Sequence, residues 1–292
     1  MPINIVCLFF FGICWGLTIP LAKIAVDAGH HPLGLIFWQL LIGGVVLGGY
    51  LLANRETVSL SARSIRYFLL IAVIGTLVPN TFSLLAIQQL PAGIMAIVIS
   101  TVPMVSLAIA VLARIEAFSW VRSLGVLIGV CALLLIALPD ASLPDPTKAP
   151  WLLVAMIAPL CYAVEGNFVA ARSPPDLSPI ATLFGASCVG VIVLLPIVWP
   201  LGMGVSLTTR WDVSHWAILA SAVGHVVAYA GYLWMLRRAG AVFTSQVAYI
   251  VTLTGIAGSL LMLGERYGLT AWIAIILMFV AMSLVKPLQR DA

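Results

Sequence analysis

The sequence predicts an all-α integral membrane protein of about ten transmembrane helices, arranged as two inverted five-helix repeats around a central cavity. Three observations lead to this fold class. Hydrophobic residues make up 63% of the 292 residues and charged residues 8%, with a mean hydropathy of +1.16. Soluble domains are nearer ~45–50% apolar and ~25% charged. The apolar residues form runs that reach the ~20 residues needed to cross a bilayer as a helix. Finally, the two halves of the chain match each other in register.

Polar interruptions separate the predicted spans in order along the chain. In the first half DAGHHP, ANRETV, IQQLP and ARIEAFS divide the spans Ile3–Val26, Pro32–Ala53, Ser64–Ile87, Pro91–Leu112 and Ser119–Leu138. In the second half RSPPDLSP, GMGVSLTTRWD, LRRAG and GERYG divide the spans Ala149–Ala171, Ser178–Leu201, Val213–Met235, Ala241–Leu263 and Leu269–Val285. The loops are too short to form a soluble domain. We expect no cleavable signal, because the first apolar run has no basic region before it and is long enough to remain as a span.

Charge placement predicts the orientation in the membrane. With the N-terminus inside, the inner loops and the tail hold ten of the fourteen Lys and Arg residues. The positive-inside rule therefore places both termini in the cytoplasm. By the same rule the net charge of +4 is a signal of topology, and no nucleic-acid partner is expected.

The two halves of the chain repeat each other around the polar segment PDASLPDPTKAP. At an offset of 149 residues Glu116 matches Glu265 and Phe118 matches Tyr267, whereas nearer the start of each half the offset is 147 and Cys14–Trp15 matches Cys161–Tyr162. The predicted domains are a first repeat at 1–138, a loop at 139–149, a second repeat at 150–286 and a cytoplasmic tail at 287–292. Because five spans is an odd number, the two copies must have opposite orientations in the membrane, an arrangement that transporters use for alternating access.

Three segments resemble a known family: CWGLTIPLAK, LARIEAFSWVRSLGVLIGVCALLL and LMLGERYGLTAWIAIILMFVAMSLV. They are similar to the EamA-type repeats of the drug/metabolite transporter superfamily, and the likeness covers essentially the whole chain. Within that superfamily the chain looks most like bacterial inner-membrane exporters of amino acids, including aromatic ones. The resemblance implies a multi-pass protein of the bacterial inner membrane that needs no cofactor. Gln39 stands where many relatives have an arginine, so a role of that arginine does not transfer.

Polar residues at helical spacing predict a substrate site, since polar groups in a span should face the bundle interior or a water-filled cavity. They lie at matching positions of the two repeats, which favours one shared cavity. Its rings, hydroxyls and amide suit a small zwitterion with a variable side chain. The alternative for any one of them is helix packing. The candidate substrate-binding residues are Trp15, Thr18, Thr76, Asn80, Ser83, Ser100, Tyr162, Glu165, His225, Tyr229, Tyr232, Ser245, Tyr249 and Thr252.

Several other polar residues favour a structural role. Glu116 and Glu265 each precede a span, where a carboxylate complements the helix dipole, with Ser119 or Thr270 as N-cap and Arg114 or Arg266 as ion-pair partner. Lys23 either extends to the outer surface or meets a substrate carboxylate. Prolines inside spans, at Pro20, Pro79, Pro103, Pro159 and Pro196, are expected to bend or break their helices.

Glu165 is the candidate that breaks the symmetry of the repeats, because its counterpart is Thr18. An intramembrane carboxylate is a functional candidate, here for binding a proton or a substrate ammonium. The alternative is a neutral glutamic acid that holds helices together. Asn167 lies two residues on, faces another side of the helix and is expected to be a local helix partner.

These features predict a secondary transporter that exports small amphipathic metabolites, chiefly aromatic and other neutral amino acids, by alternating access. The alternative is a broad-specificity drug or metabolite exporter of the same fold. An intramembrane enzyme is less favoured, since HExxH, GxSxG and paired intramembrane aspartates are all missing from the sequence. A channel is also less favoured, because no repeated filter loop is present. The expected partners are the substrate and the lipid bilayer, protons are a candidate coupling ion, the protein is expected to be a monomer, and no metal site is expected.

Overall fold

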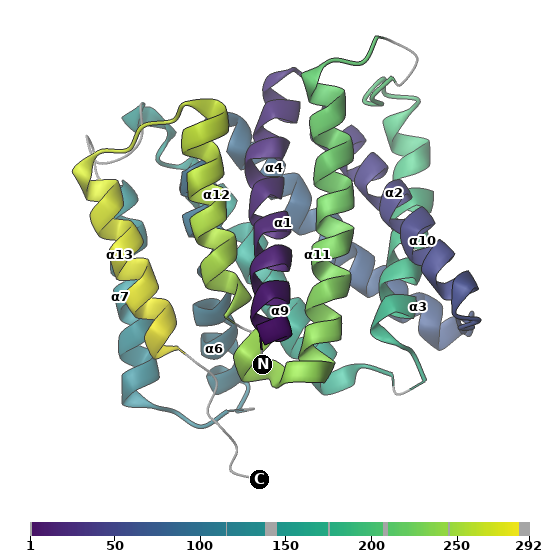
Figure 1. Ribbon diagram of the computed structural model, residues 1–292, viewed down its shortest axis with the longest axis horizontal. Helices are drawn as coiled ribbons and strands as arrows, with labels where there is room; N and C mark the ends of the chain where they lie inside the picture. Colours follow the sequence, from purple (N-terminus) through teal and green to yellow (C-terminus); the bar gives the residue numbers. More distant parts are fainter. Residues whose placement is uncertain are drawn as a thin grey trace.

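The computed structural model describes residues 2–114, 116–137, 145–174, 176–206, 210–244 and 246–285. Within these residues all regular structure is helical (Figure 1), which confirms the predicted all-α class. The predicted cytoplasmic tail at 287–292 and most of the loop at 139–149 lie outside the described residues.

Among the described residues, seven helical segments are long and apolar enough to cross a membrane, and three shorter apolar helices complete the predicted set. The first half contains α1 (Pro2–Asp27), α2 (Pro32–Ala53), α3 (Ala62–Ile71), η1 (Ala72–Leu77), α4 (Val78–Gln89), α5 (Ala92–Ile99), α6 (Val102–Leu112) and α7 (Trp120–Ala137). The second half contains η2 (Pro146–Lys148), α8 (Trp151–Ala155), α9 (Ile157–Arg172), α10 (Pro179–Val198), α11 (Val213–Thr244), α12 (Val247–Leu263) and α13 (Leu269–Leu284). Large apolar side chains such as Leu112 and Leu261 are more than four-fifths exposed, as a lipid-facing surface requires.

Three spans are interrupted, each close to a proline that was expected to bend or break its helix. The third span contains the π-helical segment η1 before Pro79, the fourth has a turn between α5 and α6 before Pro103, and the sixth has a turn between α8 and α9 before Pro159. Proline lacks an N–H and is tolerated best in the first turn of a helix, where each of these three lies. Pro20 and Pro196 instead lie inside the continuous helices α1 and α10.

The predicted boundary between the eighth and ninth spans is wrong. The LRRAG segment was expected to end the eighth span near Met235, but α11 continues without a break to Thr244 and α12 begins at Val247. Leucine, arginine and alanine are strong helix formers, so a pair of charges does not end a helix where no proline intervenes.

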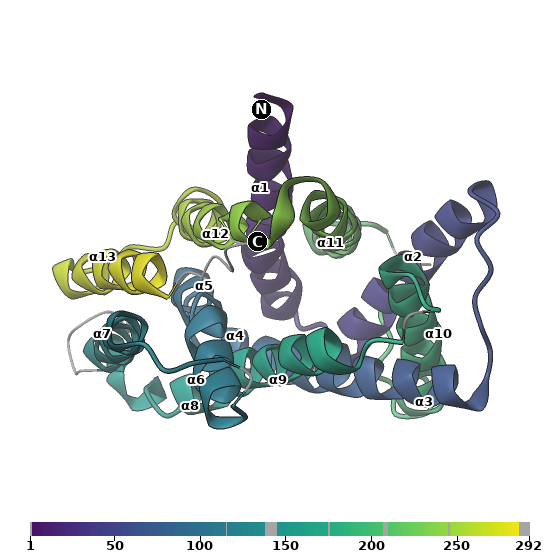
Figure 2. The same cartoon turned by 90° about the horizontal axis from the view of Figure 1, so that it is seen from below.

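The two repeats pack on each other through equivalent spans. The second, fourth and fifth spans each pack on their own counterpart, through α2 with α10, α5 with α12, and α7 with α13. Helix α1 packs on α11 and α12, and its counterpart α9 packs on α4 and α6. Seen from below, α12, α1 and α11 lie along one side of the molecule and α6 and α9 along the other (Figure 2). This packing is the arrangement that two inverted repeats produce.

Helices α1 and α12 approach closely because α1 has a glycine at the contact. A Cβ atom on Gly16 would lie 2.6 Å from the Val251 carbonyl oxygen and 2.6 Å from the Thr254 Cβ atom. Small residues permit such backbone contact between membrane helices. Any larger side chain at Gly16 would force the two helices apart.

Candidate functional site

An aromatic cluster joins α1 to α11. The Trp15 ring lies among three rings of α11, with centroid distances of 5.9 Å to His225, 5.7 Å to Tyr229 and 5.9 Å to Tyr232, all edge to face. His225 and Tyr229 also stack on each other at 6.3 Å. The structure thus brings together four of the predicted site residues from opposite repeats. Their rings present faces that can hold an apolar or cationic group.

A second polar group forms where α9 faces the third span. The Tyr162 hydroxyl donates a hydrogen bond of 2.6 Å to Oδ1 of Asn80. The Glu165 carboxylate lies against Gly75 in the π-helical segment, where a Cβ atom would be 2.1 Å from Oε1. Only a glycine leaves room for the carboxylate in that position. Thr76, the next residue of the same segment, is half-buried.

Glu165 has neither a hydrogen-bond donor nor a cation as partner among the residues that the structure describes. It is partly exposed, and it lies within electrostatic reach of the Tyr162 and Tyr229 hydroxyls. The carboxylate is therefore within electrostatic reach of both groups, and no donor or cation among the described residues competes with a proton or a cationic ligand for it. This arrangement is what an intramembrane site for a small polar solute requires.

Three predicted site hydroxyls are instead bonded to their own helices. Thr18 donates to the Trp15 carbonyl at 2.6 Å, Ser100 to that of Ile97 at 2.7 Å, and Thr252 to that of Ala248 at 2.9 Å. Such bonds are common for hydroxyl residues in helices and leave less capacity for a ligand. The Ser83 hydroxyl is buried and has no hydrogen-bond partner among the described residues. Ser245 lies outside the described residues.

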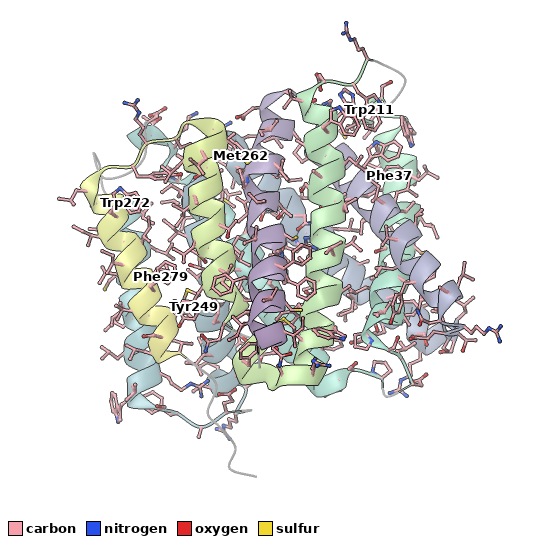
Figure 3. All side chains as sticks on the ribbon, in the orientation of Figure 1. Phe37, Trp211, Tyr249, Met262, Trp272 and Phe279 are labelled. Atoms are coloured by element: carbon pink, nitrogen blue, oxygen red, sulfur yellow. The ribbon has the colours of Figure 1, made fainter. Side chains whose placement is uncertain are left out.

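Tyr249 lies apart from the aromatic cluster. Its ring stacks on Phe279 of α13 at 5.7 Å, and in Figure 3 both residues lie in the half of the molecule away from the end that carries Trp211. Tyr249 lines a pocket of about 200 Å³ together with Pro103, Asn167 and Arg122. A pocket of about 260 Å³ at Lys23, Gln88 and Glu265 contains none of the predicted site residues.

The two repeat-related glutamates have structural roles, but their expected partners are wrong. Glu265 accepts hydrogen bonds from the backbone N–H groups of Ala92 at 2.7 Å and Gly93 at 3.1 Å, and from the Tyr267 hydroxyl. It therefore caps α5, in the other repeat, while the N-cap of α13 is Gly268 and not Thr270. Glu116 pairs with Arg122 and not with Arg114. The partners of Glu265 are set by how distant helices pack, which sequence spacing does not reveal. Arg122 is only six residues from Glu116, in the first turn of α7, so here the loop selects the later of two nearby arginines.

Lys23 and Asn167 are both held by protein groups. The Lys23 ammonium donates to the Ile87 carbonyl at 2.8 Å and pairs with Asp27 at 3.0 Å. It thus ties the end of α1 to the end of α4. Asn167 donates to the Ser106 hydroxyl at 2.9 Å and to the Ala163 carbonyl of its own helix, so it is the helix partner that its position predicted.

Two residues of the site were missed. Gly75 carries no polar group, and only its contact with Glu165 shows its importance. Tyr67 stacks on Phe168 of α9 at 6.0 Å, and its buried hydroxyl has no partner among the described residues. A π-helical segment inserts a residue and rotates the chain beyond it, so helical spacing could not connect Tyr67 with Asn80.

The apolar helices, and the packing of spans in one half on their counterparts in the other, define a multi-pass membrane protein built from two related halves. The chain belongs to the EamA-like transporter family, whose profile matches residues 2–138 and 149–286. The family likeness expected from the sequence is thereby confirmed.

Individual relatives agree with this assignment. The inner membrane transporter YedA of Escherichia coli (strain K12) is 24% identical over 289 residues, which cover 95% of this chain and 89% of that protein. An S-adenosylmethionine/S-adenosylhomocysteine transporter of Chlamydia trachomatis serovar L2 is 25% identical over 163 residues, 54% of this chain and 49% of that one. A solved crystal structure matches 95% of the chain with a TM-score of 0.58 at 17% identity, which shows a shared fold.

Proposed function

We propose that this transporter exports small amphipathic metabolites, above all aromatic and other neutral amino acids, across the bacterial inner membrane by alternating access. The observation that carries the proposal is the Glu165 carboxylate, which has no partner among the described residues and lies within electrostatic reach of Tyr229 in the aromatic cluster of Trp15, His225, Tyr229 and Tyr232. Membership of a transporter family supports transport as the activity. The chemistry of the site adds the class of substrate.

Each part of an amino acid has a matching group in the site. The ammonium binds the Glu165 carboxylate, which has no protein cation to displace among the described residues. The side chain lies on the rings of Trp15 and Tyr229, which favour aromatic and apolar groups. The carboxylate accepts from the Asn80 amide, whose Oδ1 is taken by Tyr162 and whose NH₂ remains a donor.

The relative from Chlamydia supports an amino-acid head group as the common feature. S-adenosylmethionine and S-adenosylhomocysteine, named for that transporter, both carry an α-amino acid at one end and a purine at the other. The same rings would also stack on a purine, so a broader metabolite exporter is the second candidate. A competition panel against labelled phenylalanine separates the two, because a broad exporter is inhibited by amphipaths that lack an amino-acid group.

The proposal also covers the orientation of the protein in the membrane and the ion that is coupled to transport. Both termini lie in the cytoplasm, as the distribution of basic residues favours, and the domains are the two repeats at 1–138 and 150–286. A proton on Glu165 is the coupling ion, since a carboxylate without a counter-ion can exchange a proton for a substrate ammonium. The transporter acts as a monomer.

Purified protein in liposomes tests the activity itself. A carrier gives saturable uptake of labelled L-phenylalanine and accelerated uptake when the liposomes are preloaded with the unlabelled amino acid. Empty liposomes and liposomes loaded with a sugar are the controls. Flux that rises linearly with concentration and shows no counterflow would rule out a carrier.

The variant Glu165→Gln tests the proposed role of the carboxylate. Glutamine keeps the size of the side chain but can neither carry the negative charge nor exchange a proton. We expect at least a tenfold loss of uptake, since a charge-assisted hydrogen bond contributes roughly 1.5–3 kcal/mol, and loss of the pH dependence of transport. Glu56→Gln, the same substitution at an exposed carboxylate outside the site, is the matched control and should leave uptake unchanged. Uptake and pH profile unchanged in Glu165→Gln would return this residue to a structural role.

A further inference from the structure

A second pocket lies at the end of the bundle where α6, α7, α9, α12 and α13 meet. It has a volume of about 200 Å³ and is lined by polar as well as apolar side chains, among them Glu116, Arg122, Asn167, Gln246 and Tyr249. The aromatic cluster and Glu165 are not part of its lining. The pocket therefore offers a set of polar groups that the site described above does not use.

Two hydrogen-bond donors in this pocket are left without acceptors. Arg122 is only 6% exposed, and its Nε atom is buried with no partner among the described residues. The Tyr249 hydroxyl is likewise buried and unpaired, although its ring is fixed by stacking on Phe279. Unpaired buried donors are unfavourable unless a ligand or water completes them. Both donors belong to residues that line one cavity, so a ligand that enters it and moves these side chains can supply the missing acceptor.

The remaining groups of the pocket set the charge of its ligand. Arg122 Nη1 donates to Glu116 Oε2, so one side of the pocket carries a paired positive and negative charge. The Asn167 NH₂ group is occupied by Ser106 and Ala163, which leaves its carbonyl oxygen as an acceptor. Donors for an anion and acceptors for an ammonium thus lie in the same small cavity.

We propose that this pocket is a second substrate site, which binds the zwitterionic head group of an amino acid before it reaches the aromatic cluster. The carboxylate accepts from Arg122 Nε and Tyr249 Oη, and the ammonium donates to Glu116 and the Asn167 carbonyl. This inference rests on the proposed function, because it takes amino acids to be the substrates. With the termini in the cytoplasm, the pocket lies on the cytoplasmic side, since its lining includes Val285 at the end of α13.

Two conservative variants test the site. Tyr249→Phe removes only the hydroxyl and keeps the stacking on Phe279, and Arg122→Lys keeps the charge beside Glu116 but removes Nε. Transport of L-phenylalanine is measured in inside-out vesicles, where substrate enters from the cytoplasmic face, and in right-side-out vesicles. We expect each variant to raise the KM from the cytoplasmic face roughly tenfold, as the loss of a hydrogen bond to a charged group predicts. The KM from the opposite face stays within twofold.

Matched controls separate recognition from folding. Tyr50→Phe on α2 and Arg114→Lys are the same substitutions at exposed positions outside the pocket, and both should leave the KM unchanged. L-phenylalaninamide lacks the carboxylate, so its KM should not differ between the parent protein and the two pocket variants. A variant that merely folds poorly would lower the maximal rate for both compounds and from both faces.

The outcomes distinguish this site from the proposed function. If the parent protein transports amino acids and both pocket variants keep its cytoplasmic KM, the pocket proposal falls and the function stands. If the parent protein transports none, both fall. A phospholipid that copurifies with the parent in native mass spectrometry and is lost in both variants, with an unchanged KM, would assign the pocket to a lipid phosphate and overturn the proposal.

Discussion

Among single residues, Gly75 decides where the Glu165 carboxylate can lie. The carboxylate fills the space that a side chain at Gly75 would take, and it has no donor or cation among the described residues to hold it elsewhere. A small residue in one repeat thus positions the charged residue of the other. Gly75 matters because it has no side chain, which leaves the space that the Glu165 carboxylate occupies.

Gly75→Ala is expected to displace the carboxylate and weaken transport. The added Cβ atom would lie 2.1 Å from Oε1 and 2.5 Å from Cδ, so the Glu165 side chain must move. We expect a loss of L-phenylalanine uptake of roughly tenfold, since the ammonium contact is a hydrogen bond to a charged group. Gly49→Ala on α2 is the matched control, because a Cβ atom there meets nothing within 4 Å. Equal uptake by the two variants would contradict this role of Gly75.

At the scale of elements, the ends of the helices are held by residues from the other half of the chain. Glu265 caps α5 across the repeats, and Lys23 ties α1 to the carbonyl at the end of α4. The loop before α2 is tied to the start of α11, where His30 Nε2 lies 2.8 Å from the Ser214 hydroxyl. These contacts fix the ends of helices that carry the site.

Glu265→Gln tests the cap on α5. An amide offers one acceptor oxygen in place of two and no charge for the buried first-turn N–H groups of Ala92 and Gly93, which have no partner within the helix. We expect the free energy of unfolding to fall by about 1–2 kcal/mol, seen as a lower apparent melting temperature in detergent. Glu56→Gln, whose carboxylate accepts from the Ser178 hydroxyl at an exposed site, should leave the melting temperature nearly unchanged. Equal changes in melting temperature for the two variants would show that the cap on α5 does not contribute to stability.

The His30 contact predicts acid sensitivity at the start of α11. Burial, and then the nearby His215, hold the pKa of His30 below its usual value, so the folded protein binds this proton less tightly than the unfolded chain. Stability from neutral His30 is therefore present above the unfolded pKa of about 6.5 and falls as the pH drops through it. Hydrogen bonds from Ser214 and then His215 hold the pKa of Asp212 low, and that contribution is lost only at more acidic pH, below about 3.9.

We expect His30→Gln to reduce the acid dependence of stability. The apparent melting temperature of the parent protein should fall more between pH 7.5 and 5.5 than that of the variant, because glutamine takes up no proton. His31→Gln is the control, since His31 is exposed. Parallel pH profiles for the parent and His30→Gln would contradict the assignment.

At the scale of the whole molecule, the sequence predicted the number, order and class of the spans because lipid solubility is a property of each segment alone. It did not predict the partners of Glu265, because these depend on the packing of segments that are far apart in the sequence, and of two nearby arginines it named the wrong partner for Glu116. It also missed Tyr67, since the π-helical segment shifts the helical face, and it placed a break at LRRAG where the helix continues. For the site, residue types indicated Trp15 and Glu165 individually, but only the packing of α1 on α11 shows which rings meet.

The length of α11 has a mechanical consequence. The helix runs without interruption from the rings at His225, Tyr229 and Tyr232 to Thr244, three residues before α12 begins. In Figure 1 the last part of α11 turns away from the axis of its upper part and runs toward α12, so the helix is continuous but bent. A tilt of the upper part, which carries the three rings, would therefore also move the turned part and the start of α12 beside Gln246 and Tyr249. Loading at one pocket and release at the other would then be coupled through one continuous helix.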